Sequence, residues 1–292
     1  MTAVIGAPAP LRHPEPTAPQ PVRAARFPRS AGRPAGPGLR PMWAERLTGD
    51  PLPPPGDPEP VGHAFADMCA ELLDPIQASG PLELVVLAHV TPDLDPRDSV
   101  AGALAEPDLL VFAVSDQGRL APFTALQVAA AWPDRSRAAV IVLDQAVVPY
   151  RDPDLSALDG RFDHAVALRP DLGFEPVRQW AGVTGDRVAD VLGPALAAEH
   201  PDLVILGPAL PPPDGWNWCR APGDQLGTAV FAALGAVLDA STDTGERPAR
   251  VTVVEYEPAL GGLALVTWSA PARPARHLAP VPELLPDRTN RR

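Results

Sequence analysis

One arrangement of short apolar runs occurs twice along this chain of 292 residues. In the first half, LELVVLAH (82–89) and RAAVIVLDQ (137–145) flank an alanine-rich helical segment. In the second half, PDLVILGP (201–208) and RVTVVEYE (250–257) flank a second alanine-rich helical segment. Short runs rich in β-branched residues are typical of strands buried on both faces, which alternate with helices in α/β domains. The sequence therefore predicts an α/β protein built from two similar halves with paired central helices.

Hydrophobic periodicity places the elements of both halves. The first half should contain helices over 63–78, 99–105 and 119–132 and strands over 84–89, 109–114, 138–144 and 162–168. The second half should contain helices over 185–199 and 225–239 and strands over 203–206, 251–256 and 263–268. We expect a Pro-rich, partly extended arm over 1–60, half-domains over 61–170 and 171–270, and a flexible tail over 271–292.

The N-terminal arm allows two interpretations. Proline recurs every few residues from Pro8 to Pro60, which breaks regular helix and favours extended or coiled backbone. A disordered tail would have this composition. However, Phe27, Met42 and Trp43 are apolar anchors, and Val4-Ile5 could form a short strand. The alternative is therefore an irregular arm packed on the body.

Charge and composition exclude several classes of function. The net charge is −12 and all 24 cationic residues are arginine, so the surface field should repel a phosphate backbone and nucleic-acid binding is not expected. No apolar run approaches the roughly 18 to 20 residues that span a bilayer, and residues 1–10 do not resemble a signal peptide. We expect a soluble, cytoplasmic protein.

Metal and nucleotide chemistry also lack their usual signatures. Cys69 and Cys219 give neither a disulfide framework nor a zinc-ligand spacing. The chain contains no Gly-x-Gly-x-x-Gly, phosphate-binding loop, Gly-x-Ser-x-Gly or His-Glu-x-x-His motif. We therefore expect no metal and no cofactor.

Two acidic segments open the central helix of each half. They are Ser115-Asp116-Gln117-Gly118 and Gly223-Asp224-Gln225-Leu226-Gly227. Each is typical of a helix start with an aspartate at or near the N-cap. If a pseudo-dyad relates the halves, the two entrances should converge. Asp116 and Asp224 are then either simple caps or two carboxylates in one pocket that could serve as an acid and a base.

The order of five segments resembles the thiolase fold, in particular its beta-ketoacyl synthase III branch. The segments are ELVVLAHVTPDLDPRDSVAGALAE (83–106), FAVSDQGRLAPFTALQVAAAW (112–132), DLVILGPALPP (202–212), GDQLGTAVFAALGAVL (223–238) and VTVVEYEPALGGLALVTW (251–268). The resemblance covers most of the chain. It implies acyl-thioester chemistry, pairing through a strand near 109–114, and a place in specialised metabolism.

The same resemblance implies that this chain lacks the family's catalytic residues. Its nucleophilic cysteine would fall at Leu120, or at Arg119; its histidine falls at Gly207 and its asparagine at Asp224. Leucine offers no nucleophile, glycine offers no donor side chain, and an ionised aspartate would repel an oxyanion. Condensing activity is therefore not expected. The interval from Gly207 to Asp224 is also short, and a Trp-rich loop should replace the family's helix there.

Other side chains allow a functional and a structural interpretation. Cys219, beside Trp216, Trp218 and Arg220, is either a relocated nucleophile whose thiolate the arginine favours or a small packed side chain. His89 ends a predicted strand and either faces a crevice or stabilises its turn. Glu199-His200 should end a helix. Glu255 and Glu257 share one strand face and border either a pocket or solvent.

Two functions follow from these patterns. The first is an enzyme of specialised metabolism that handles an acyl-CoA or acyl-carrier-protein thioester by non-condensing chemistry. The second is a catalytically inactive ketosynthase homologue that forms a homodimer, or a heterodimer with a true ketosynthase. For the enzyme, the candidate catalytic residues are Asp116, Asp224 and Cys219, and the candidate substrate-binding residues are Gln117, Gln225, Trp216, Trp218 and His89.

Overall fold

The computed structural model describes residues 19–34, 61–94, 99–146, 160–244 and 247–270. The expected strand at Val4-Ile5, the anchors Met42 and Trp43, and the tail over 271–292 lie outside these residues. Within them, each half of the chain builds one five-stranded sheet.

The two sheets share one topology. Sheet 1 has the order β1 (Val22–Pro28), β7 (Phe162–Leu168), β6 (Ala138–Asp144), β4 (Leu84–His89), β5 (Leu110–Val114). Sheet 2 has the order β8 (Arg178–Trp180), β12 (Gly262–Ser269), β11 (Arg250–Glu257), β9 (Leu203–Leu206), β10 (Trp218–Arg220). The strand directions also correspond, since the three strands at one side of each sheet run parallel and the other two pair antiparallel. The predicted duplication is confirmed. A separate two-stranded ribbon joins β2 (Arg33–Pro34) and β3 (Val61–Gly62).

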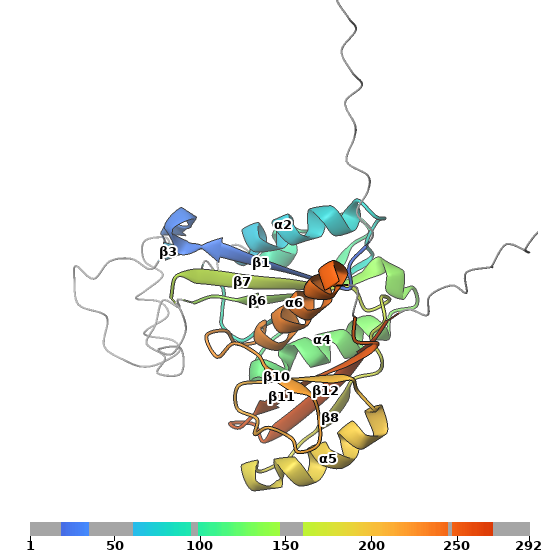
Figure 1. The fold of residues 1–292 in the computed structure, drawn as a ribbon. Helices are drawn as coiled ribbons and strands as arrows, with labels where there is room; N and C mark the ends of the chain where they lie inside the picture. Colours follow the sequence, from blue (N-terminus) through green and yellow to red (C-terminus); the bar gives the residue numbers. More distant parts are fainter. Residues whose placement is uncertain (1–18, 35–60, 95–98, 147–159, 245–246, 271–292) are drawn as a thin grey trace, which may run out of the picture.

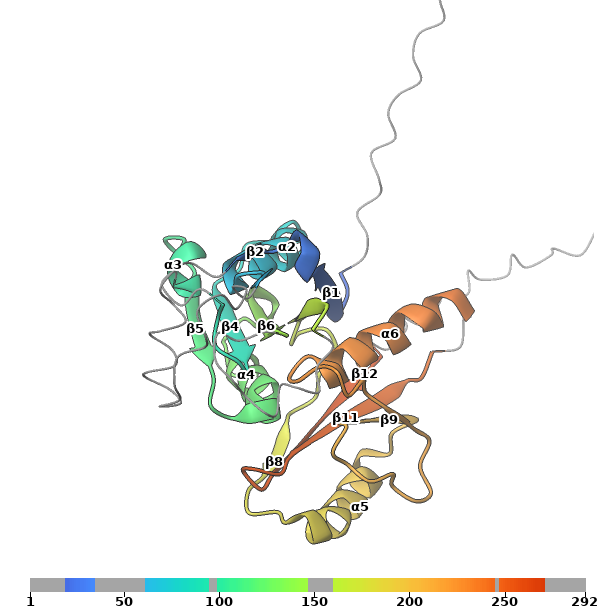
Figure 2. The same ribbon diagram turned by 90° about the vertical axis from the view of Figure 1, so that its left-hand side faces the viewer.

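The helices form layers around and between the sheets (Figure 1). Helix α2 (Phe65–Gln77) covers the outer face of sheet 1, and α5 (Val188–Glu199) covers the outer face of sheet 2. Helices α4 (Ala121–Ala130) and α6 (Ala229–Thr244) lie between the two sheets, as the turned view in Figure 2 also shows. The short helix α3 (Val100–Ala103) lies between β4 and β5 in the sequence.

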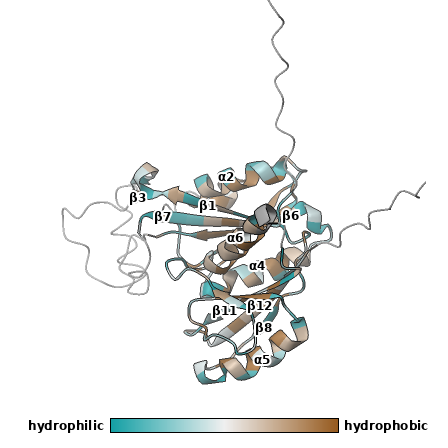
Figure 3. Cartoon of the chain, viewed as in Figure 1, coloured by the Kyte–Doolittle hydropathy of each residue, from teal (hydrophilic) through white to brown (hydrophobic). Residues whose placement is uncertain are grey.

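This layering follows from the distribution of apolar residues. Helix α2 buries one stripe at helical spacing: Phe65, Met68, Cys69, Leu72, Leu73 and Ile76. The central helices bury side chains against both sheets, and the largest hydrophobic cluster joins them to sheet 1 and sheet 2. Figure 3 shows apolar residues along the sheets and the helices between them. The centre of the fold is therefore apolar except where individual side chains bring polar groups into it.

Three differences from the predicted elements are informative. Residues of the expected arm form β1, an edge strand that pairs with β7 and buries Val22 and Phe27, so this part of the arm is regular structure. Edge strands tolerate the flanking prolines because their outer N–H groups need no partner. The short strands β8 and β10 were not predicted, and β10 lies within the expected Trp-rich loop.

The predicted start of the second central helix at residue 225 is wrong by several residues. Helix α6 begins at Ala229. The residues before it form a loop whose N–H groups bond a carboxylate from the other half of the chain.

Candidate functional site

The central strands β6 and β11 end in acidic residues at equivalent positions. Ala138 pairs with Leu84, and Val251 pairs with Leu203, at the start of the corresponding strands. Counted from those pairs, Asp144 and Glu257 occupy the same place in the two halves. Both carboxylates reach across the pseudo-dyad to the helix entrance of the opposite half.

Asp144 binds the entrance of α6. One carboxylate oxygen, Oδ2, accepts hydrogen bonds from the Leu226 N–H at 3.0 Å, the Thr228 N–H at 2.8 Å and the Thr228 hydroxyl at 2.6 Å. The other, Oδ1, accepts from the Gly227 N–H at 3.1 Å. The side chain is 3% exposed. Leu226, Gly227 and Thr228 directly precede α6, where the positive end of the helix dipole favours a buried carboxylate.

Glu257 binds the entrance of α4 in the reciprocal way. Its Oε2 accepts a hydrogen bond from the Arg119 N–H at 3.1 Å, in the short 3-10 turn Gly118–Leu120 that leads into α4. Gly118 has a φ of 53°, and a side chain there would overlap the Glu257 carboxylate. The Arg119 guanidinium donates to the Gln225 carbonyl at 3.0 Å, which ties the two entrances together.

These contacts use N–H groups of the two loops that lead into the central helices. Helix N-termini stabilise bound phosphates, carboxylates and developing oxyanions through free N–H groups. Here the N–H groups of Arg119, Leu226, Gly227 and Thr228 already bond fixed carboxylates. A substrate oxyanion would have to displace one of them.

Glu255 is the most unusual ionisable group near these entrances. It is fully buried, and its Oε1 accepts a hydrogen bond from the Tyr256 N–H at 3.1 Å. Its Oε2 has no hydrogen-bond partner among the described residues. Burial raises the pKa of Glu255 to about 8, and the nearby Arg119 guanidinium opposes that shift. The carboxyl is therefore protonated at neutral pH and can donate a proton.

Glycine at position 207 makes room for Glu255. A side chain at Gly207 would overlap the Glu255 carboxylate, so the position at which the family resemblance places a histidine cannot hold one in this arrangement. Leu120, at the position of the family's nucleophile, is buried against Gly262 in a similar way. Glu255 thus fills the space at the expected histidine position, and a buried leucine occupies the expected nucleophile position.

The structure places Asp116 and Asp224 in different surroundings. Asp116 is exposed, with a φ of 61°, and the Ser115 hydroxyl is 3.5 Å from its carboxylate. The N-cap of α4 is Leu120, so the prediction that Asp116 caps this helix is wrong. Asp224 is half-buried beside the entrance of α6, where Asp144 provides the capping carboxylate.

The two glutamines anchor the entrances within their own halves. Gln117 Oε1 accepts a hydrogen bond from the Thr124 hydroxyl at 2.5 Å, and Gln225 Oε1 lies 3.2 Å from the Thr228 hydroxyl oxygen, whose proton is donated to Asp144. These contacts hold the loop of each entrance against its helix.

Cys219 lacks the surroundings of an activated nucleophile. Burial raises the pKa of its thiol. The Arg220 guanidinium donates to the carbonyls of Pro208 at 2.9 Å and Leu210 at 2.6 Å and lies 5.8 Å from the Trp218 ring centre. Trp216 packs against the cluster under α5, and Trp218 is 40% exposed. The environment therefore favours the neutral thiol.

His89 contacts its own turn. Its Nδ1 is 2.8 Å from the Thr91 carbonyl oxygen, and its ring lies 5.3 Å from the Phe65 ring. Burial lowers the pKa of His89, so the ring is neutral at pH 7 and stabilises the chain where β4 ends.

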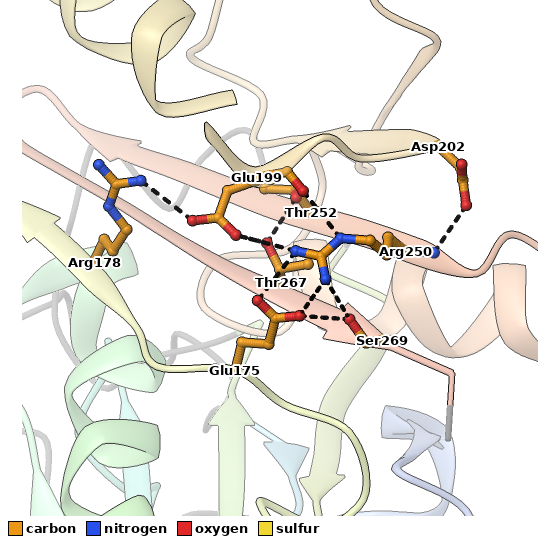
Figure 4. A network of polar contacts seen from close by, with 8 residues as sticks. All are labelled: Glu175, Arg178, Glu199, Asp202, Arg250, Thr252, Thr267 and Ser269. Carbon is orange, nitrogen blue, oxygen red and sulfur yellow. Dashed lines mark hydrogen bonds and ion pairs between the residues drawn. The ribbon is translucent and has the colours of Figure 1, made fainter. Parts of the chain in front are cut away.

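A second polar network lies at the end of sheet 2 where β11 begins and β12 ends (Figure 4). The Arg250 guanidinium is 2.6 Å from a Glu175 oxygen and 3.5 Å from a Glu199 oxygen. Glu199 also accepts from Arg178 at 3.2 Å and from the Thr267 hydroxyl at 3.0 Å. The network joins the end of α5 to the sheet. Its arginine and glutamate side chains pair with one another, which indicates a structural role. His200 ends α5 with a φ of 49°.

The described residues contain no cluster of three or more His, Cys, Asp or Glu side chains arranged to hold a metal ion. No helix in this part of the chain combines the length and apolar character needed to cross a membrane.

Solved structures identify the fold as thiolase-like. AbyA1, a tetronic acid condensing enzyme, is 17% identical, with a TM-score of 0.52, and the match covers 85% of this chain and 98% of AbyA1. ChlB3, described as an acyltransferase, is 15% identical with a TM-score of 0.51 over 85% of this chain and 96% of its own. The 3-oxoacyl-(acyl carrier protein) synthase III FabH from Pseudomonas aeruginosa PAO1 is 16% identical with a TM-score of 0.46 over 85% and 96% of the two chains. No family model and no curated protein matches the sequence.

We predict that Asp144→Asn destabilises the protein by about 3 kcal/mol, because an amide cannot replace a carboxylate that accepts four hydrogen bonds in a buried site. Urea unfolding followed by circular dichroism measures the loss. Asp116→Asn, at an exposed aspartate before α4, is the matched control and should change the free energy of unfolding by less than about 0.5 kcal/mol. Equal effects of the two substitutions would contradict the capping role.

We also predict that the protein becomes less stable as the pH rises from about 6.5 to about 8, above the range in which the lowered pKa values of His89 and His164 have the opposite effect. The unfolded chain releases the Glu255 proton near the ordinary pKa of 4.5, whereas the folded chain keeps it until about 8, so rising pH favours unfolding between these values. Glu255→Gln should flatten this part of the pH profile in urea unfolding. Glu257→Gln, on the same strand, should leave the slope in place. A wild-type profile without the fall would refute the prediction.

Proposed function

We propose that this chain is a non-condensing thiolase-fold protein that works as a dimer partner of a ketosynthase-type enzyme. The observation that carries the proposal is the reciprocal closure of both central helix entrances by Asp144 and Glu257. A condensing enzyme needs a nucleophile and free oxyanion donors at this place. This chain offers Leu120 and donors that are already bonded to carboxylates.

The proposed pathway is the acyl-thioester chemistry of specialised metabolism. The names of two structural neighbours, a tetronic acid condensing enzyme and an acyltransferase, support this setting. A subunit without its own chemistry could contribute to such a pathway by completing a dimer with an active enzyme or with a second copy of itself. We propose the cytoplasm as its compartment.

The proposed dimer surface is the free edge of sheet 1. Strand β5 is the outermost strand and pairs only with β4 within the described part of the chain. Leu110 on this strand is 50% exposed, and Ala113 is exposed as well. An edge strand with apolar exposed residues can pair with another strand. This edge is also where the family resemblance implies pairing.

A second candidate function is non-condensing acyl-thioester chemistry with Glu255 as the acid. The unpartnered Oε2 of Glu255 and its raised pKa favour this candidate, since both are typical of a group that exchanges a proton with a ligand. In this candidate, Asp116, Asp224 and Cys219 remain proposed catalytic residues, and Gln117, Gln225, Trp216, Trp218 and His89 remain proposed substrate contacts.

Intact-protein mass spectrometry distinguishes the two candidates. We predict neither a covalent adduct nor loss of thioester when the full chain is incubated with a panel of acyl-CoA and acyl-carrier-protein thioesters. Turnover that Glu255→Gln abolishes would establish the second candidate, and the turnover of Cys219→Ala would show whether Cys219 takes part in it. An adduct on Cys219, or condensation of any substrate, would overturn the proposal that the chain is non-catalytic.

We predict that Leu110→Glu lowers the mass measured by light scattering from a dimer to a monomer at micromolar concentration, because charges on an edge strand oppose strand pairing. Leu260→Glu is the matched control, since Leu260 is 52% exposed at the turn between β11 and β12 and should leave the dimer intact. If the chain alone is monomeric, the measurement is repeated after co-expression with a ketosynthase III-type enzyme of the same genome. A wild-type chain that stays monomeric in both settings would contradict the proposed partner role.

A further inference from the structure

A cavity of about 450 Å³ lies between sheet 1 and α6 and reaches the entrance of α6 at Gln225. Strands β1 and β7 form one wall, and α6 forms the other. The apolar side chains that line it are Ala24 and Val166 from the sheet and Ala232, Ala233 and Ala236 from α6. This volume is within the range of small-molecule sites, and walls of alanine leave a smooth apolar slot.

The inner end of the cavity carries a buried imidazole without a partner. His164 on β7 is 6% exposed, and its Nε2 has no hydrogen-bond partner among the described residues. Gln225, which is 2% exposed, lines the same end. Asp224 and Phe162 lie beside His164 and Gln225 at this end. A buried polar atom that lacks a partner costs free energy, which a ligand with a hydrogen-bonding group would recover.

The charges around the cavity balance. Arg26 on β1 is the cross-strand neighbour of His164 on β7, and Arg26 is exposed at the rim of the cavity. Asp224 lies beside the end that His164 lines. Asp144, the other nearby carboxylate, accepts four hydrogen bonds from the entrance of α6. Burial lowers the pKa of His164, and the ring is neutral at pH 7. A charged ligand would thus meet one attractive and one repulsive formal charge.

We propose that this cavity binds an uncharged, largely apolar small molecule through one carbonyl or hydroxyl oxygen, which forms a hydrogen bond with His164 Nε2. The apolar body lies along the alanine wall of α6, and the oxygen reaches the inner end of the cavity. The site does not depend on the proposed partner role, because binding requires neither turnover nor a second subunit.

Isothermal titration calorimetry of the full chain with 2-nonanone tests the proposal. We expect saturable binding with one site per chain and at least tenfold weaker binding of octanoate, whose carboxylate brings a charge. His164→Phe should weaken the binding of 2-nonanone about tenfold, because it removes the hydrogen bond while keeping an aromatic ring.

A cavity-filling variant keeps the test informative if His164→Phe fails to fold. Ala236→Leu places a larger side chain in the cavity at an exposed position of α6, so it should preserve the fold and weaken the binding of 2-nonanone at least tenfold. Ala197→Leu, at an exposed position of α5, is the matched control and should bind as the wild type does. The absence of saturable binding, tighter binding of octanoate, or equal effects of the two leucine variants would overturn the proposal.

Discussion

The hydrogen bonds between Asp144 and the entrance of α6 hold the two halves of this protein together at the centre. A buried carboxylate from sheet 1 satisfies three consecutive N–H groups of the second half, and the dipole of α6 offsets the cost of burying its charge. Glu257 repeats the contact in the opposite direction. The start of α6, the position of Arg119 and the need for glycine at 118 all depend on this exchange of carboxylates.

The same exchange limits the chemistry that the centre can perform. In a fold whose structural neighbours include a condensing enzyme, helix entrances with free donors can stabilise negative charge. Here the donors stabilise the protein's own carboxylates, and Leu120 and Glu255 fill the space beside them. The buried Glu255 carboxyl can still donate a proton, which is the basis of the alternative acid–base role. The first proposed function instead uses the surface of the protein, at the edge strand β5.

The sequence predicts local structure well where one pattern decides it. Continuous apolar runs gave strands β6 and β7 with their observed limits, and the repeated order of segments gave the two-halved fold. Strand β1 was missed because VRAARFP mixes charged residues and proline and becomes a strand only by pairing with β7. Asp144 was missed as a site residue for a related reason, since its partners at 226–228 are brought to it by the fold of the second half. An acidic residue at the end of a buried strand was the only local signal.

Amide hydrogen exchange measured by NMR tests the central claim most directly. If Asp144 accepts from the N–H groups of Leu226, Gly227 and Thr228, these amides will exchange as slowly as those of the buried strands, although they precede the helix. In Asp144→Asn they will exchange markedly faster, while the amides of α5 keep their protection. Exchange of the three amides at the rate of an open loop in the wild-type protein would contradict the account, because the helix entrance would then be free to bind an anion.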